Sequence, residues 1–169
     1  MHRELYANLS QPKGATFKGQ RYRTRSEAKW AIVFTELEIP FYYQPSHYRL
    51  ASGTYQPDFW LPSIESYVEV KPQNVHDPRY TELGQMQGKR VFLVAADIPY
   101  LPSSWLESDI YPALKDHIWL KWPYEQGNFM LAREAQGRYN FIPIALASSA
   151  KGNDQRILSA YMRASTHRF

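Results

Sequence analysis

Apolar residues recur at helical spacing across RTRSEAKWAIVFTELE, residues 23–38, which is the clearest helix prediction in the chain. They form two adjoining rows with steps of three or four residues, the period of a helix face. Thr24 and Glu27 match the S/T-x-x-E capping box, which marks a helix start. Pro40 is expected to end the helix, because proline cannot continue the backbone hydrogen bonding.

Short apolar segments bounded by prolines and turn residues follow this helix, and they predict strands. The expected strands cover residues 41–45, 55–61, 66–71 and 90–97, with a turn at 52–54 and a break at 62–63. Pro57 lies inside the second strand, which indicates a sheet edge or a bulge there. The run RVFLVAAD (90–97) is continuously apolar, which is typical of a strand covered on both faces.

A helix is predicted at residues 77–88, where a glycine ends it, between the strands 66–71 and 90–97. A strand-helix-strand order implies that the two strands pair in parallel. The later part of the chain predicts a strand at 117–122, a hairpin turning at Gln136-Gly137, and a closing helix at 153–169.

The predicted fold class is therefore α/β in the broad sense (α+β), with a mixed central sheet. Residues 1–20 have no clear period and contain Pro12, Gly14 and Gly19, so we expect a loose arm there. No linker is long enough to divide the chain, which predicts a single domain over 1–169. Its core would be residues 23–97, and residues 98–169 would be a C-terminal elaboration packed on that core.

Composition narrows the class of protein. Apolar residues make up 44% of the 169 positions, which argues against disorder, and no stretch is apolar enough to span a membrane. The first residues lack the apolar core of a signal peptide, so the expectation is a cytoplasmic protein. The chain has no cysteine, which excludes disulfides and thiolate zinc sites and fits a reducing compartment.

The formal net charge of +4 favours a polyanionic partner, because neutralised phosphates release counterions. Basic residues concentrate in one run that only Glu27 interrupts: Lys13, Lys18, Arg21, Arg23, Arg25 and Lys29. Arg21, Arg23, Arg25 and Lys29 are the expected contacts to a nucleic-acid backbone. Aromatic residues interleave with this run and could stack on bases, although most of them could equally belong to the core.

Charged residues also lie within two apolar strands. Side chains alternate along a strand, so Glu69 and Lys71 share one face, and a hairpin across residues 62–63 would bring Asp58 beside Glu69. Two adjacent carboxylates repel each other unless a cation lies between them, and Mg²⁺ accepts such ligands together with waters and phosphate oxygens. Lys71 could then hold the attacking water or help to deprotonate it, and contact the phosphate, and Glu27 could add a carboxylate from the helix.

These residues resemble a known signature. Pro57-Asp58, ten intervening residues and then Glu69-Val70-Lys71 are similar to the PD-(D/E)xK motif of the restriction-endonuclease-like nuclease superfamily. A glutamate on the preceding helix, here Glu27, is also a feature of that superfamily, and the element order over 23–97 resembles its αβββαβ core. Segments such as YQPDFWLP and YVEVKP resemble phage-associated members, some of which carry a C-terminal cysteine zinc ribbon.

The resemblance implies a DNA endonuclease that depends on Mg²⁺, for which Mn²⁺ could substitute, in a bacterial or phage-infected cell. Asp58 and Glu69 would be the metal ligands, and Lys71 and Glu27 would complete the catalytic set. No zinc site is expected, because the cysteines of the ribbon are absent. In some branches of the superfamily a glutamine on the helix after E-x-K assists the site, and Gln85 or Gln87 could do so here. Gln44 and Gln73 lie close to the expected site and are candidates for substrate contacts.

Other interpretations stay open at this point. Glu27 could serve only the capping box, Asp58 could cap a turn, and Glu69 with Lys71 could be a surface ion pair of little energetic value. A non-cleaving nucleic-acid-binding or anti-defence protein on a nuclease scaffold is the alternative function. The aromatic residues of the C-terminal half suit either a homodimer interface or a small second core: Trp119, Trp122, Tyr124, Phe129, Tyr139 and Phe141.

Overall fold

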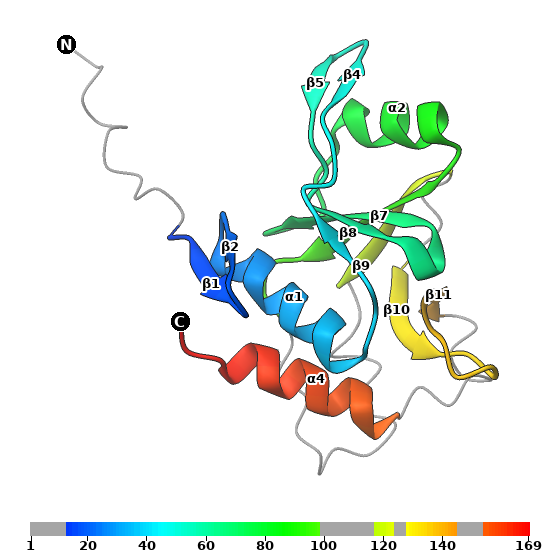
Figure 1. The fold of residues 1–169 in the computed structure, drawn as a ribbon. Helices are drawn as coiled ribbons and strands as arrows, with labels where there is room; N and C mark the ends of the chain where they lie inside the picture. Colours follow the sequence, from blue (N-terminus) through cyan, green and yellow to red (C-terminus); the bar gives the residue numbers. More distant parts are fainter. Residues whose placement is uncertain (1–12, 99–116, 124–127, 145–153) are drawn as a thin grey trace.

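A mixed central sheet organises the chain in the computed structural model, which describes residues 13–98, 117–123, 128–144 and 154–169 (Figure 1). Seven strands of this part pair in the order β11-β10-β9-β8-β7-β6-β3. Their bounds are β3 Tyr42–Tyr43, β6 Phe59–Leu61, β7 Ser66–Lys71, β8 Arg90–Ala95, β9 Ile118–Trp122, β10 Asn128–Arg133 and β11 Tyr139–Pro143. Strands β7 and β8 pair in parallel, and the other neighbouring strands of this sheet pair antiparallel.

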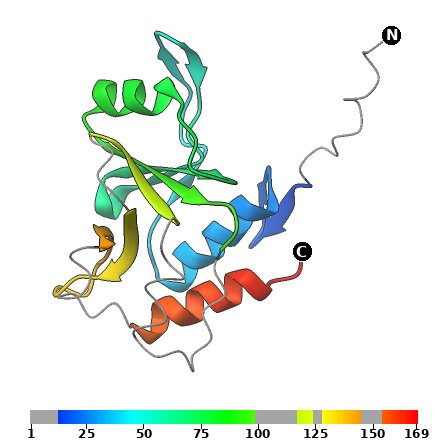
Figure 2. The ribbon, with the colours of Figure 1, turned by 180° about the vertical axis from the view of Figure 1, so that it is seen from behind.

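Helices cover both faces of this sheet. Helices α1 (Arg25–Glu36) and α4 (Gln155–Thr166) lie side by side on one face, and α2 (Pro78–Gln87) lies on the other (Figures 1 and 2). This three-layer arrangement buries both apolar faces of the sheet under helices. It confirms the predicted mixed α/β class with a large mixed sheet. None of the helices in the described residues is long and apolar enough to cross a membrane.

The capped helix and the parallel crossover agree with their sequence patterns. Thr24 caps α1, and Asp77 and Gly88 bound α2, with Gly88 in the left-handed conformation that ends helices. The predicted strands at 66–71 and 117–122, the C-terminal hairpin and the closing helix are confirmed as β7, β9, β10 with β11, and α4. The predicted strand at 90–97 ends earlier, at Ala95.

Two small hairpins differ from the predictions. β1 (Ala15–Phe17) pairs with β2 (Gln20–Tyr22), so the expected loose arm is wrong for the residues after 14, while residues 1–12 lie outside the described part. β4 (Tyr48–Leu50) pairs with β5 (Gly53–Tyr55), and the turn lies at residues 51–52 instead of 52–54. Strands of three residues are too short to show a readable period, which is why the sequence pattern missed them.

The strand predicted over 55–61 is split. Tyr55 ends β5 and Phe59 begins β6, with Gln56, Pro57 and Asp58 between them outside either strand. Pro57 has no backbone N–H to donate to a neighbouring strand, which explains the interruption. The predicted strand at 41–45 is likewise only the two residues of β3. Asp58 therefore lies immediately before a strand, where its side chain and backbone can serve a site.

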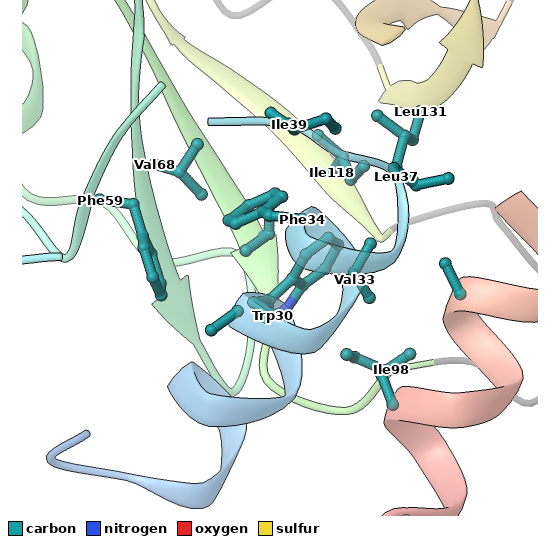
Figure 3. Packing of buried hydrophobic residues seen from close by; sticks show 14 of the residues in the cluster. Trp30, Val33, Phe34, Leu37, Ile39, Phe59, Val68, Ile98, Ile118 and Leu131 are labelled. Carbon is teal, nitrogen blue, oxygen red and sulfur yellow. The ribbon is translucent and has the colours of Figure 1, made fainter. Parts of the chain in front are cut away.

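One apolar cluster fixes α1 against the sheet. Phe34 of the helix packs toward Phe59 and Val68 of the strands, and Trp30 lies beside Phe34 with a ring-centroid distance of 5.8 Å (Figure 3). All four side chains are buried. The Trp30 indole Nε1–H donates a hydrogen bond of 2.8 Å to the carbonyl oxygen of Ala95, at the end of β8. This contact anchors the N-terminal half of α1 beside the carboxyl ends of β7 and β8.

The aromatic residues of the C-terminal half bear on the dimer alternative. Four of them are buried inside this chain, namely Trp119, Phe129, Tyr139 and Phe141. Phe92 of β8 contacts the rings of Phe129 and Phe141 at centroid distances of 5.3 and 4.8 Å, so these residues extend the main core. The core interpretation therefore accounts for them without a second copy. Tyr124 lies outside the described residues.

Candidate active site

The hairpin of β6 and β7 brings the two strand acids together. These strands pair antiparallel with Phe59 opposite Val68, so Asp58 and Glu69 are the next facing pair. The backbone N–H of Asp58 donates to Glu69 Oε1 at 3.0 Å, and the N–H of Val70 donates to Asp58 Oδ2 at 2.9 Å. Each carboxylate is thus held by a backbone N–H from the facing segment, in a fixed position.

Both carboxylates are removed from solvent. Asp58 is 0% exposed and Glu69 is 2% exposed, which excludes the interpretation of Glu69 and Lys71 as a surface ion pair. Buried charges of like sign are costly unless cations compensate them. Two cations do so here, since Lys71 Nζ lies 3.3 Å from Glu69 Oε2 and the Arg23 guanidinium pairs with Asp58 Oδ1.

The electrostatics of the pair reflect this burial. Desolvation, followed by the negative charge of Asp58, raises the pKa of Glu69, and Lys71 only partly opposes the shift. Burial alone would lower the pKa of Lys71, but the carboxylates of Glu69 and Asp58 outweigh that effect and raise it. Lys71 therefore stays protonated at neutral pH and can act as a hydrogen-bond donor.

Tyr55 adds a buried hydroxyl next to the acids. Tyr55 is 7% exposed, and its hydroxyl lies beside the Glu69 carboxylate. Burial and the charges of Glu69 and Asp58 raise the pKa of Tyr55, which keeps the hydroxyl protonated. A neutral donor is thus available near Glu69.

Glu27 serves the helix cap and also faces the site. Its backbone N–H donates to Thr24 Oγ1 at 3.0 Å, which is the first half of the capping box. Its side chain does not complete the box in the usual way, because Glu27 Oε2 accepts from the N–H of Arg23 at 3.1 Å and from the Tyr43 hydroxyl at 2.6 Å. Burial, then the charge of Asp58, raises the pKa of Glu27.

Arg23 links the helix acid to the strand acid. Its Nε lies 3.8 Å from Glu27 Oε1, while its Nη2 pairs with Asp58 Oδ1. The sequence prediction assigned Arg23 to a nucleic-acid backbone, and in the structure its guanidinium turns toward these carboxylates. The side chain remains 53% exposed, so it can exchange this partner for another one.

A cleft of about 770 Å³ opens beside these groups. The β1/β2 hairpin, the start of α1 and the end of β7 line it through Gly14, Arg21, Tyr22, Arg23, Thr24, Ser26, Glu27, Val70, Lys71, Pro72 and Ala96. Lys71 is 36% exposed in this wall, whereas Glu69 behind it is buried. Neither Asp58 nor Glu69 lines the cleft, but Arg23 and Lys71 line it and pair with these two carboxylates, so the cleft adjoins the pair on that side.

The other predicted cations separate into two groups. Arg21 is exposed and lines the cleft, where it can meet a phosphate, and Arg25 is exposed at the first residue of α1. Lys29 lies elsewhere, because its Nζ donates to the Ser165 carbonyl oxygen at 3.5 Å near the end of α4. The assignment of Lys29 to nucleic acid therefore has no support from its position, since the Lys29 ammonium packs against the closing helix.

The glutamine candidates also separate. The backbone N–H of Gln44 donates to the carbonyl oxygen of Asp58 at 2.8 Å, so Gln44 adjoins the site. Gln73 is exposed in the loop just after β7. Gln85 and Gln87 are exposed on α2, whose buried residues are Tyr80, Leu83 and Gly84. Among the described contacts, none joins Gln73, Gln85 or Gln87 to the carboxylates.

Sequence reasoning missed Tyr43 and Tyr55 as site residues. Tyr43 holds Glu27 by a hydrogen bond, and Tyr55 lies against Glu69. A usable signal exists for each one: Tyr43 belongs to the strand that pairs with β6, and Tyr55 stands three residues before Asp58. The hydroxyl of a tyrosine in an otherwise apolar segment needs a polar partner when it is buried.

The metal-binding capacity of this site rests on two carboxylates. In the described part of the chain, no three His, Asp or Glu side chains gather closely enough to hold a metal ion together. Mg²⁺ does not require three, because it commonly takes one or two carboxylates and keeps several waters. Asp58 and Glu69 fit that ligand set, since each oxygen that accepts a backbone N–H or a cation retains a second lone pair.

Comparisons of the chain with protein-family profiles, with curated proteins and with solved structures found no match. The functional assignment therefore depends on the geometry of the site and on the motif that its residues resemble.

Proposed function

We propose that this chain is a divalent-metal-dependent DNA endonuclease with a restriction-endonuclease-like core, acting in the cytoplasm of a bacterial or phage-infected cell. The observation that carries the proposal is the interlocked pair Asp58 and Glu69, fully buried, with Lys71 beside it at a cleft. Buried like charges reduce stability, so a carboxylate pair of this kind beside a cleft is typical of a functional site. Arg21 at the cleft wall supplies a contact for a phosphate of the DNA backbone.

Asp58 and Glu69 would hold the metal ion, Mg²⁺ or Mn²⁺. When bound, the ion supplies a water of lowered pKa and neutralises charge on the scissile phosphate. Hydrolysis forms a bond from the water oxygen to phosphorus and breaks one phosphorus–oxygen ester bond, and the leaving oxygen takes up a proton.

The other residues of the site prepare the reactants. Lys71 is protonated, so its ammonium orients the attacking water and donates to a phosphate oxygen where negative charge increases. The backbone N–H groups of Asp58 and Val70 hold the two carboxylates in place before the substrate arrives. Glu27 acts through Arg23, which it positions beside Asp58.

A plasmid assay tests this proposal directly. Supercoiled DNA incubated with the protein is expected to become nicked and then linear with Mg²⁺ or Mn²⁺, and to stay intact with EDTA. Electrophoresis of the products measures the conversion. DNA that is bound but intact under every metal condition would instead support the non-cleaving binding protein.

Arg23 makes a separate prediction about the metal. In EDTA, Arg23→Gln is expected to destabilise the protein by about 1–2 kcal/mol, because the buried Asp58 loses its paired cation. The effect is moderate because the Arg23 side chain is half-exposed, so solvent screens the pair. Added Mg²⁺ should restore most of this loss, since the ion replaces the missing charge.

Thermal unfolding with and without Mg²⁺ measures both effects. Arg25→Gln is the matched control, because Arg25 is exposed two residues later and, in the described residues, pairs with none of these carboxylates. Equal behaviour of the two variants would show that Arg23 is not the counter-cation of this cluster.

A further inference from the structure

A second hollow lies between the β1/β2 hairpin and β3, at the edge of the sheet. Its volume is about 470 Å³. It is lined by Phe17, Lys18, Gln20, Tyr22, Thr35, Phe41, Tyr42, Tyr43, Gln44 and Pro45, and we refer to it as the aromatic groove. Half of these residues are aromatic, one is a cation and none is an acid.

The aromatic groove is connected to the candidate active site. Tyr22 lines both the groove and the cleft. The hydroxyl of Tyr43 in the groove wall donates to Glu27 at 2.6 Å, and the N–H of Gln44 donates to the Asp58 carbonyl oxygen at 2.8 Å. A ligand in the groove would therefore lie beside residues that directly hold the carboxylates.

The chemistry of the lining suits a nucleotide. Tyr42 is 61% exposed, and Lys18 is exposed with its Nζ 5.8 Å from the centroid of the Phe17 ring. Aromatic rings offer faces for base stacking, the amides of Gln20 and Gln44 can pair with base edges, and an ammonium attracts phosphate. No carboxylate lines the groove itself.

We propose that the aromatic groove binds an unpaired nucleotide of the DNA, next to the phosphate that is cleaved. The bases of an intact duplex are stacked on one another and cannot present a face to Tyr42, whereas those of a single strand, fork or flap can. The protein thus prefers DNA with an unpaired strand. The place of this subsite in catalysis rests on the proposed function, while nucleotide binding does not require cleavage.

Binding in EDTA tests the inference without cleavage. Fluorescence anisotropy would compare a labelled single strand, a forked duplex and a blunt duplex of the same sequence. We expect the single strand and the fork to bind more tightly than the blunt duplex. Tyr42→Ala should weaken the binding of the single strand and the fork by about tenfold through loss of one stacking face, and Tyr42→Phe should retain it.

Two further variants separate stacking from general effects. Met86→Ala is the control, because Met86 is 48% exposed on α2 and is not part of the groove. Lys18→Asn should make the negative slope of log affinity against log salt for the single strand shallower by about 0.7, the value for one phosphate contact. Asparagine is chosen because Lys18 has a φ of 47°, which asparagine adopts more readily than most residues.

The outcomes are distinct for the two proposals. Equal affinity for the fork and the blunt duplex, or wild-type binding by Tyr42→Ala, would overturn the proposal that the aromatic groove binds an unpaired nucleotide. Plasmid cleavage could still establish the endonuclease in that case. Loss of single-strand binding in Tyr42→Ala, together with no cleavage by the wild type, would support nucleotide binding in the aromatic groove and refute the endonuclease proposal. A groove that binds peptides and no DNA would overturn the inference.

Discussion

Replacement of Asp58 by asparagine is expected to abolish metal-dependent DNA cleavage, with a loss of about 10³-fold or more. Asparagine keeps the side-chain oxygen that accepts the Val70 N–H, so the local backbone arrangement survives. It removes the negative charge that would bind the metal and that pairs with Arg23. The rate of plasmid nicking measures the loss, and circular dichroism establishes that the variant is folded.

Asp154→Asn is the matched control for this experiment. Asp154 caps α4, and its side chain accepts from the Arg156 N–H, a role that asparagine performs equally well. The same chemical change at this capping position of the closing helix should leave cleavage unchanged. Undiminished cleavage by Asp58→Asn would refute the proposed metal site, whatever the control shows.

Much of the fold was predictable where one pattern repeats over many residues. β7 and the parallel β8 extend over six residues each, and α1 combines a capping residue with more than three turns of apolar spacing. The hairpin of β1 and β2 was not predictable in this way, because it depends on a tertiary contact. Tyr22 is buried against Tyr43 at a centroid distance of 4.6 Å, and nothing in their local sequences joins them.

The candidate site divides along the same line. Alternation along paired strands predicts that Asp58 faces Glu69, and the register of β6 and β7 confirms it. The direction of the Arg23 and Lys29 side chains was not predictable, because it depends on how α1 packs against the strands and against α4. Arg23 precedes the helix and turns inward to Asp58, whereas Lys29 faces α4. Two cations from one basic run thus have unrelated surroundings.

Replacement of Glu69 by glutamine is expected to abolish cleavage and, in EDTA, to raise stability. Burial and Asp58 raise the pKa of Glu69, so the folded protein retains a proton that the unfolded chain releases above about pH 4.3. The contribution of Glu69 to the free energy of unfolding is therefore fully present below that pH. It is lost as the pH rises through the raised pKa. Glutamine removes this loss, so the gain over wild type should grow with pH, to the order of 1–2 kcal/mol.

Thermal unfolding between about pH 5 and pH 8 measures this gain, because the pKa of Glu69 is raised to about 8. Glu82→Gln on α2 is the control, because Glu82 Oε2 accepts from the Ser52 N–H and hydroxyl and glutamine keeps an oxygen for them. Glutamine still offers an oxygen to the Asp58 N–H, so the strand contact persists, but Lys71 loses its charged partner. A fall in stability at every pH would mean that the ion pair with Lys71 dominates and that Glu69 is a structural acid. A rise in stability together with lost cleavage would mean that the chain keeps a destabilising carboxylate for its chemistry, as a metal ligand requires.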